Sequence, residues 1–346
     1  MTTAVAVSGG VDSLFALHLL RERGERVFAV HAFFLPPDRE SLDRRNRLAE
    51  VCADLGVSLH VLDLSRDFRD RIIEPFVRSY ARGLTPNPCA QCNREAKFGL
   101  ILSSARELGA ERLGTGHYAR LLRDGASSAS LWRGADPAKE QSYFLSLLTP
   151  SQLARACFPL GDWSKEEVRA QIARRVRSLP ESSESQEICF VPGGDYRAFL
   201  EAQDVRLPGE GPILDSRGRE LGRHSGLHRF TVGQRRGLGI AYSEPLYVLS
   251  KDLEANALFV GTRDELRSGA CRVREMNYLL DPESWPTEVY IQTNYREKPR
   301  PVEVSHEAGG RAKVRFARRG KPATPGQIGA FYSGSGRVLA GSVIES

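Results

Sequence analysis

Residues 8–13, Ser-Gly-Gly-Val-Asp-Ser, combine groups that can bind a phosphate. They follow an apolar run, residues 4–7, and precede apolar positions at helical spacing in residues 14–20, which predicts a buried strand, a turn and a helix. The glycines let the backbone approach a ligand, and the helix start offers unpaired N–H groups and the positive end of its dipole. The two serines can donate hydroxyls, while Asp12 can hold a magnesium ion or the turn itself. A Walker A loop would need a lysine before its Ser or Thr, so we predict a phosphate site of another kind.

A second candidate centre consists of cysteines. Cys89 and Cys92 follow a proline-rich loop, Thr85–Pro88, and open a predicted helix that continues over residues 93–108. The i, i+3 spacing puts both sulfurs on one side of the first turn, and a helix N-terminus favours the thiolate, so we expect pKa values below the ~8.5 of a free cysteine. Cys189 lies far away in the sequence. A structural zinc site would need a second C-x-x-C pair, which the sequence lacks, and a thioredoxin-like redox pair lacks its usual surroundings.

The composition is that of a globular protein with room for two or three domains: 346 residues, 41% hydrophobic and 27% charged. The sequence has no apolar run of about 18 residues and no cationic, apolar leader, so we predict a cytoplasmic protein without a membrane segment. Six cysteines in so long a chain do not form a disulfide framework. Cys52, Cys157 and Cys271 fall within ordinary element patterns, and we interpret them as structural.

The net charge of +6 belongs to the C-terminal part of the chain, because residues 1–204 balance and residues 205–346 carry the whole excess. Within residues 217–236, arginines that include Arg235 and Arg236 are interleaved with glycines and an aromatic side chain. Flexible, arginine-rich loops suit phosphate backbones and splayed bases. This segment therefore predicts contacts with a nucleic acid.

The elements expected around these residues alternate between strand and helix in the first 120 residues. This alternation predicts an α/β fold, a Rossmann-like parallel sheet with helices on both faces, with ligands at the carboxyl ends of its strands. We also expect helical structure over residues 153–176, with Asp162, Glu166 and Glu167 in the first turn of one helix, and a polar loop at 182–186. Glycines, prolines and short apolar runs after residue 205 predict a small mixed or β module and then a C-terminal β-barrel-like domain. The expected domains are residues 1–204, 205–268 and 269–346.

The motifs, taken together, resemble a known family. The string S-G-G-x-D-S after the first strand is similar to the pyrophosphate loop of the N-type ATP pyrophosphatases, which split ATP between its α and β phosphates. Further motifs extend the resemblance to the bacterial tRNA 2-thiouridylases (the MnmA family), in that family's order and over nearly the whole chain. They are Thr85–Pro88 with Cys92 and Asn93, Thr115–Tyr118, Lys139–Leu145, Ile188–Phe190, Thr231–Ile240, Thr324–Gln327, and Phe331 with Tyr332.

The resemblance implies an activity, its cofactors and its partners. Such enzymes use ATP and Mg²⁺ to adenylate the 2-position carbonyl of the wobble uridine in the tRNA anticodon arm, then replace the oxygen with sulfur and release AMP. The sulfur would come from a cysteine desulfurase, a sulfur-relay protein or free sulfide. Cys92 would be the nucleophile and Cys189 the persulfide carrier. ATP would lie among Ala6, Val7, Ser8, Gly9, Gly10, Val11, Asp12, Ser13, Ala32 and Gly116. The tRNA would contact Asn87, Pro88, His117, Lys139, Glu140, Gln141, Asn294, Tyr295 and Gln327, in addition to Arg235 and Arg236.

Three of these positions depart from the family's pattern. Cys89 stands where an aspartate is usual, Glu140 replaces an aspartate, and Asn294 replaces an arginine. Cys89, Cys92 and Cys189 would together give the three thiolate ligands of a [4Fe–4S] cluster with one open iron, which related thiolating enzymes use to hold sulfide. The other mechanism is a persulfide on Cys189 that Cys92 resolves, and the sequence leaves both open. A different activity, an amide-forming ATP pyrophosphatase acting on a small substrate, would use the same phosphate loop but would leave the three cysteines unexplained.

Overall fold

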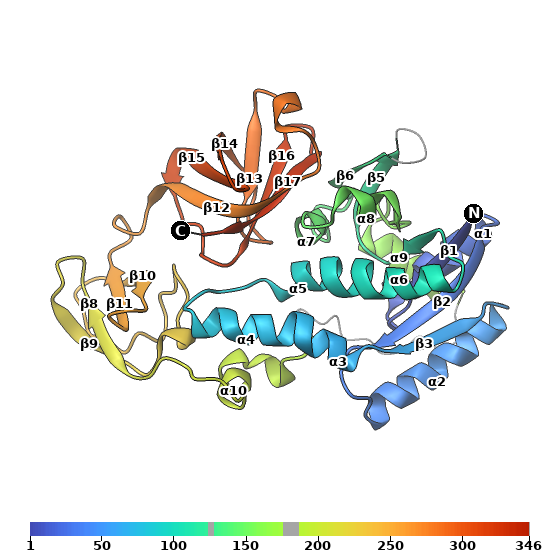
Figure 1. The fold of residues 1–346 in the computed structure, drawn as a ribbon, viewed down its shortest axis with the longest axis horizontal. Coiled ribbons are helices and arrows are strands. Elements are labelled where there is room, and N and C mark those ends of the chain that lie inside the picture. The colour runs from blue at the N-terminus through green and yellow to red at the C-terminus, as the bar shows by residue number, and fades with distance from the viewer. Residues whose placement is uncertain (124–127, 176–186, 346) are drawn as a thin grey trace.

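The structure is a computed structural model that describes residues 1–123, 128–175 and 187–345, and within them it contains three sheets and a hairpin (Figure 1). The N-terminal sheet has the strand order β3-β2-β1-β4-β7, and its pairings are parallel. Its strands are β1 (Thr2–Ala6), β2 (Arg26–Phe33), β3 (Leu59–Asp63), β4 (Arg112–Gly114) and β7 (Ala156–Cys157).

Helices cover both faces of this sheet. Successive residues of β1 point to opposite faces, so the clusters that contain them show what packs on each side. Val5 belongs to a hydrophobic cluster with side chains of α1 (Val11–Glu22), α2 (Arg39–Asp54) and α9 (Lys165–Ala173). Ala4 belongs to a second cluster that includes Phe98, Leu102 and other side chains from the opposite face. The predicted Rossmann-like α/β sheet is therefore confirmed.

Two helical runs contain π-helical segments. Arg69–Ile73 joins α3 (Ser65–Phe68) to α4 (Glu74–Ala81), and Cys92–Ile101 joins α5 (Pro88–Gln91) to α6 (Leu102–Glu107). The remaining helices are α7 (Ser142–Leu145), α8 (Pro150–Ala154), α10 (Tyr196–Glu201) and the 3₁₀ turns Pro192–Gly194, Leu227–Arg229 and Pro282–Ser284. In the part of the chain that the structure describes, no helix is both long and apolar enough to cross a bilayer.

The helical structure expected over residues 153–176 is present only in part. α8 ends at Ala154, the short strand β7 follows, and α9 begins at Lys165, so Glu166 and Glu167 lie in its first turn as expected, whereas Asp162 precedes it. Pro159 and Gly161 interrupt the helical pattern between the two helices. Ser164 then starts α9 with a capping box, in which its side chain accepts from the N–H of Glu167 and the Glu167 side chain accepts from the N–H of Ser164. Residues 176–186, with the expected loop, lie outside the described residues.

The C-terminal half consists of β-structure. The central sheet has the order β10-β11-β8-β9, and the last six strands form a closed barrel in the order β12-β15-β14-β13-β16-β17. This architecture confirms the expected β module and β-barrel. The strands are β8 (Gly211–Leu214), β9 (Glu220–His224), β10 (Tyr247–Asp252), β11 (Ala257–Gly261), β12 (Ser268–Tyr278), β13 (Val289–Gln292), β14 (Arg300–Glu307), β15 (Arg311–Gly320), β16 (Ile328–Ser333) and β17 (Val338–Ile344).

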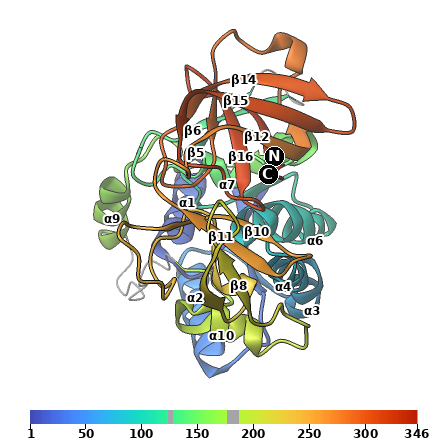
Figure 2. The ribbon, with the colours of Figure 1, turned by 90° about the vertical axis from the view of Figure 1, so that its left-hand side faces the viewer.

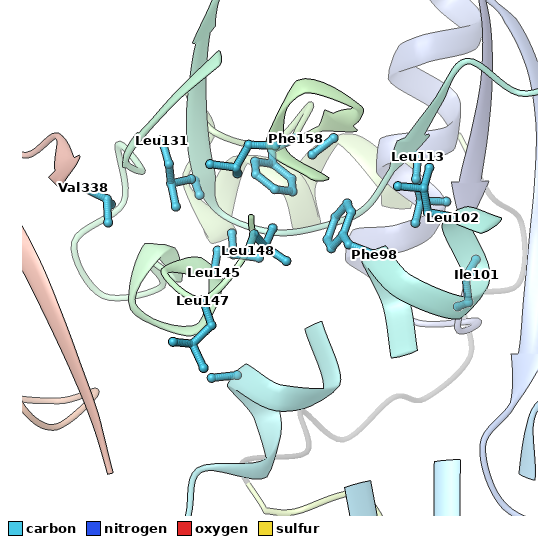
Figure 3. Close-up of a cluster of buried hydrophobic side chains, with 14 of the residues drawn as sticks. Phe98, Ile101, Leu102, Leu113, Leu131, Leu145, Leu147, Leu148, Phe158 and Val338 are labelled. Atoms are coloured by element: carbon cyan, nitrogen blue, oxygen red, sulfur yellow. The ribbon is translucent and has the colours of Figure 1, made fainter. Parts of the chain in front are cut away.

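The barrel shares a hydrophobic core with the N-terminal sheet. Val338 of β17 belongs to the same buried cluster as Leu131 of the hairpin β5 (Ala119–Arg123) and β6 (Ala129–Arg133), Leu145 of α7 and Phe98 (Figure 3). In both ribbon views the barrel lies on one side of the long helices α4 and α6, and α2 and α10 lie on the other (Figure 2). The barrel is thus fixed against the elements that carry the candidate site.

Candidate active site

The phosphate loop is already shaped for a ligand. Gly9 has φ +84°, a left-handed conformation that favours glycine. The Ser13 hydroxyl donates to the carbonyl of Gly10 over 2.9 Å and accepts from the N–H of Ser8 over 3.2 Å. These two hydrogen bonds fix the conformation of the turn. Gly10 is the N-cap of α1 and has no side chain with which to cap it, so the first N–H groups of the helix stay available to an anion.

Gly116 packs directly against this loop. A Cβ at Gly116 would lie 2.7 Å from the carbonyl carbon of Asp12 and 2.8 Å from the nitrogen of Ser13. Residue 116 therefore has to be glycine for the segment after β4 to approach the first turn of α1. The structure brings this predicted ATP residue to the loop.

Asp12 is held by two side chains that sequence reasoning did not single out. Lys165 Nζ lies 2.8 Å from each carboxylate oxygen of Asp12, and the Tyr118 hydroxyl donates to Oδ1 over 2.7 Å. Lys165 is the first residue of α9, where the Ser164 cap fixes it. The capping box is visible in the sequence, but nothing there connects residue 165 to residue 12. The structure therefore adds Lys165 to the residues that surround the phosphate loop.

One large cavity, of about 2590 Å³, joins the phosphate loop to the cysteines. All ten predicted ATP residues line it, as do Cys89, Cys92 and Cys189. Its wall near Ala32 includes His31, whose Nδ1–H donates to the carbonyl of Val7 over 2.8 Å. Residues far apart in the sequence thus face a single space in which an activated group and a sulfur group could meet.

The side of the cavity lined by Cys89, Cys92 and Cys189 is called the cysteine wall, and it begins at a capped helix. The side chain of Asn87 accepts from the N–H of Ala90 over 3.1 Å and caps α5, which carries Cys89. The π-helical segment then starts at Cys92. Gln152 of α8 donates to the carbonyls of Arg94, over 2.8 Å, and Phe98, over 3.1 Å, and so holds this segment.

The π-helical winding places Lys97 on the same side as Cys92. Residues five apart in an α-helix point about 140° away from each other. The wider winding of a π-helix, whose hydrogen bonds run from i to i+5, reduces this angle. Lys97 lines the cavity beside the cysteines, and its charge lowers the pKa values of Cys89, Cys92 and Cys189. It is therefore the cation of the cysteine wall.

Burial nevertheless dominates the titration of these thiols. Desolvation raises the pKa of Cys92 to about 12, and it also raises the pKa values of Cys89 and Cys189, although both side chains are exposed to the cavity. The expectation that the helix N-terminus would make Cys89 and Cys92 more acidic than a free cysteine is thus wrong. The loss of hydration is the largest effect on all three thiols and outweighs the charge of Lys97.

His117 lines the cavity as a neutral ring. Its Nδ1 lies 2.8 Å from the hydroxyl oxygen of Thr115, and its ring packs near Phe98 and Phe158. Burial holds the pKa of His117 well below its usual range, and the charge of Lys97 acts in the same direction. At neutral pH the uncharged imidazole can therefore donate one hydrogen bond and accept another.

The cysteines are not assembled as an iron–sulfur site in this arrangement. Among residues 1–123, 128–175 and 187–345, no group of three His, Cys, Asp or Glu side chains is close enough to hold a metal ion. The residues as placed therefore do not fit that cofactor.

Comparison with known proteins decides the family. The family model of the tRNA methyl transferase HUP domain matches residues 1–193, that of the tRNA methyl transferase PRC-barrel domain matches residues 198–262, and that of the aminomethyltransferase beta-barrel domain matches residues 268–344. The chain is 52% identical to the tRNA-specific 2-thiouridylase MnmA of Nitratidesulfovibrio vulgaris, with 99% of both chains covered. It is 51% identical to the relative of the same name from Oleidesulfovibrio alaskensis, over 100% of this chain and 99% of that one. The chain belongs to the tRNA-specific 2-thiouridylase family.

The side chains for which the 2-thiouridylase resemblance implied tRNA contacts fall into two groups. Lys139, Asn294 and Tyr295 line the cavity, and the Tyr295 ring lies 4.4 Å from that of Phe144. Pro88, His117, Glu140 and Gln141 also line it. Within the described residues, the cavity lining does not include Asn87, Gln327, Arg235 or Arg236.

Glu140 and Gln141 have hydrogen-bond partners inside the protein. Glu140 is 5% exposed, accepts from the N–H of Ser142 and lies 3.3 Å from Nε of Arg133. The Gln141 side chain accepts from the N–H of Tyr118 over 3.1 Å. In this member of the 2-thiouridylase family, both residues therefore help to fix the cavity wall.

Proposed function

We propose that this protein is an ATP-dependent tRNA-uridine 2-sulfurtransferase that converts the wobble uridine to 2-thiouridine. The observation that carries the proposal is the single cavity lined both by the phosphate loop and by Cys89, Cys92 and Cys189. The name of the family, tRNA-specific 2-thiouridylase, supports the same substrate and product. An amide-forming ATP pyrophosphatase would have no use for the cysteine wall.

The first half-reaction is adenylation. The carbonyl oxygen at the 2-position of uridine attacks the α-phosphorus of ATP, pyrophosphate leaves, and the oxygen becomes part of an AMP leaving group. The N–H groups at the start of α1, the Ser8 and Ser13 hydroxyls and Lys165 would stabilise the phosphates. Mg²⁺ is usually held by the phosphates and one or two carboxylates, and Asp12 is the carboxylate of the loop that would hold it. The ion would neutralise charge on the pyrophosphate.

The second half-reaction replaces the activated oxygen with sulfur. A sulfur nucleophile at the cysteine wall adds to C2, and AMP leaves with the former carbonyl oxygen. In the persulfide route, Cys92 attacks the inner sulfur of a Cys189 persulfide and frees sulfide for C2, which leaves a disulfide between the two cysteines. The cluster route would need all three cysteines as iron ligands, an arrangement that the described residues do not show. Cys92 and Cys189 are required in both routes, whereas Cys89 is required only in the second.

We propose a separate role for each of the three domains. Residues 1–204 would form the catalytic domain, residues 205–268 a small domain whose Arg235 and Arg236 contact tRNA phosphates, and residues 269–346 the barrel. The wobble base has to leave the anticodon stack to reach the cavity, which costs a few kcal/mol. Contacts of the arginine-rich segment with the anticodon arm would offset that cost. The tRNA and the sulfur donor named by the resemblance are the proposed partners, in the cytoplasm.

The test is nucleoside analysis of tRNA after incubation with the protein, ATP, Mg²⁺ and a sulfur source. We expect 2-thiouridine, with one AMP and one pyrophosphate for each base converted. The assay is run with a persulfide donor in air and, separately, with iron-reconstituted protein and sulfide under anaerobic conditions. Absence of 2-thiouridine under both conditions would refute the proposal.

A further inference from the structure

The loop before the cysteine helix is held by the barrel. Residues 85–88 contain two prolines, which have no N–H, so the loop has few backbone donors of its own. Carbonyls of the loop that are withdrawn from water therefore need donors from other segments. Gln327 Nε2 donates to the carbonyl of Thr85 over 2.8 Å and to that of Pro86 over 3.2 Å. In return, the N–H of Thr85 donates to the carbonyl of Pro325 over 2.9 Å. Three hydrogen bonds thus join a barrel turn to the segment that leads into α5.

The close approach depends on Gly326. Its φ is +91°, and a Cβ there would lie 2.9 Å from the nitrogen of Thr85 and 3.0 Å from Cβ of Leu84. The turn itself is fixed to the barrel, because the N–H of Gly326 donates to the carbonyl of Ile344 and the N–H of Ile344 donates to the carbonyl of Gln327, both over 2.8 Å. The turn is therefore a rigid support for the loop.

The loop connects this barrel turn to the helix that carries the cysteines. Asn87, directly after Pro86, caps α5, and α5 runs into the π-helical segment at Cys92. We infer that the turn Thr324–Gln327 positions the cysteine helix for sulfur transfer, with Gln327 as the positioning residue. This inference rests on the proposed function, and it gives Gln327 a role toward Cys89 and Cys92 in place of a direct contact with tRNA.

The barrel does not depend on Gln327 to stay docked. Asn277 Nδ2 donates to the carbonyls of Ser146, over 2.9 Å, and Leu148, over 2.8 Å, and the hydroxyls of Ser142 and Tyr332 lie 3.1 Å apart. These interactions and the shared core remain when the Gln327 amide is removed. A variant at position 327 should therefore fold and change only the loop.

The experiment compares Gln327→Met, which keeps the length and loses the donor, with Gly326→Ala, which pushes the loop away. The matched control is Asn256→Asp, because Asn256 Nδ2 also donates to backbone carbonyls, those of Gly209 and Glu210, but lies in the turn before β11, 67 positions after Cys189. For both test variants we expect thiolation turnover at saturating tRNA to fall about 10- to 100-fold, as small misplacements of reacting groups do. The dissociation constant for tRNA should stay within about twofold of wild type.

A second readout needs no activity. Iodoacetamide labelling of the buried Cys92, followed by mass spectrometry, should be about fivefold faster in both test variants, the change expected from losing one net hydrogen bond. Labelling of the buried Cys52 and Cys271 in the same samples should not change. If wild type makes no 2-thiouridine, the proposed function fails and this labelling still decides the positioning role.

Three results would overturn the inference. Turnover and Cys92 labelling that both match wild type would show that the turn does not position the helix. A higher dissociation constant for tRNA with unchanged turnover would assign Gln327 to direct tRNA binding. Faster labelling of Cys52 and Cys271 along with Cys92 would show general loosening of the fold and not a local effect.

Discussion

Lys165 Nζ lies 2.8 Å from both carboxylate oxygens of Asp12, so the first residue of α9 is paired with the first turn of α1. The lysine side chain is 11% exposed and the aspartate 33%. The pair lies in the wall of the cavity, beside the loop that we propose to hold the ATP phosphates. A cation in this position can stabilise the charge that develops when pyrophosphate leaves.

We predict that Lys165→Met slows tRNA-dependent pyrophosphate release about 100-fold, the usual effect of removing one group that stabilises transition-state charge. The control is Lys313→Met, which removes an exposed lysine of the barrel strand β15. The measurement is pyrophosphate release with saturating ATP, Mg²⁺ and tRNA. Equal rates for wild type and Lys165→Met would exclude Lys165 from the first half-reaction.

The packing of Gly116 against the phosphate loop gives a second prediction. In Gly116→Ala, a methyl group would meet the Asp12 backbone at 2.7 Å, so the loop must shift at a cost of about 1–3 kcal/mol. We expect a lower melting temperature and weaker ATP binding by calorimetry. Gly209→Ala is the matched control, because a Cβ there has nothing within 4 Å. Wild-type ATP affinity in Gly116→Ala would contradict the proposed place of ATP.

The three cysteines give a third prediction. Cys92→Ala and Cys189→Ala should each abolish 2-thiouridine formation, whereas Cys157→Ala, on strand β7, should keep it. Cys89→Ala distinguishes the two routes: it keeps persulfide-driven thiolation in one and loses all thiolation in the other. Product analysis under both sulfur conditions measures this. Thiolation by Cys92→Ala would remove the cysteine wall from the mechanism.

The raised pKa of Cys92 gives a pH dependence. Because the thiolate is the reactive form and its pKa is about 12, the thiolate fraction increases about tenfold per pH unit between pH 7 and 9. Iodoacetamide labelling of Cys92 should rise accordingly. In Lys97→Met the pKa of Cys92 should rise further, and labelling at each pH should be slower. A labelling rate that levels off below pH 8.5 would contradict this prediction.

The arginine-rich segment gives a fifth prediction. Arg235→Ala and Arg236→Ala should weaken tRNA binding and reduce the slope of log affinity against log salt by up to about 0.9 for each tRNA phosphate that the variant no longer neutralises. Arg263→Ala, which removes another exposed arginine of the C-terminal half, serves as the control. Binding titrations at several salt concentrations measure the slope. An unchanged slope would show that these two arginines bind no phosphate.

Local patterns were sufficient for much of the fold and part of the site. The apolar run before Ser8 and the helical spacing after Ser13 predict β1, the turn and α1, because these elements depend on nearby residues. The helical structure expected over residues 153–176 is interrupted between α8 and α9, because Pro159 and Gly161 outweigh the helical spacing around them.

Pairings between distant residues could not be predicted from the sequence. Lys165 and Asp12 are 153 positions apart, and Gln327 and Thr85 are 242 positions apart, so only the tertiary fold brings them together. The pKa of Cys92 could not be predicted for the same reason. The dipole at a helix start can be inferred from a motif, whereas the burial that outweighs it depends on the packed protein around the thiol.

The central claim is that the carbonyl oxygen of uridine leaves as part of AMP while sulfur takes its place in the same cavity. The most direct test uses tRNA whose wobble uridine carries ¹⁸O at the 2-position, with unlabelled ATP and water. We predict AMP that contains one ¹⁸O atom for each 2-thiouridine formed. Unlabelled AMP alongside 2-thiouridine would contradict the account, because the oxygen would then have left without being adenylated.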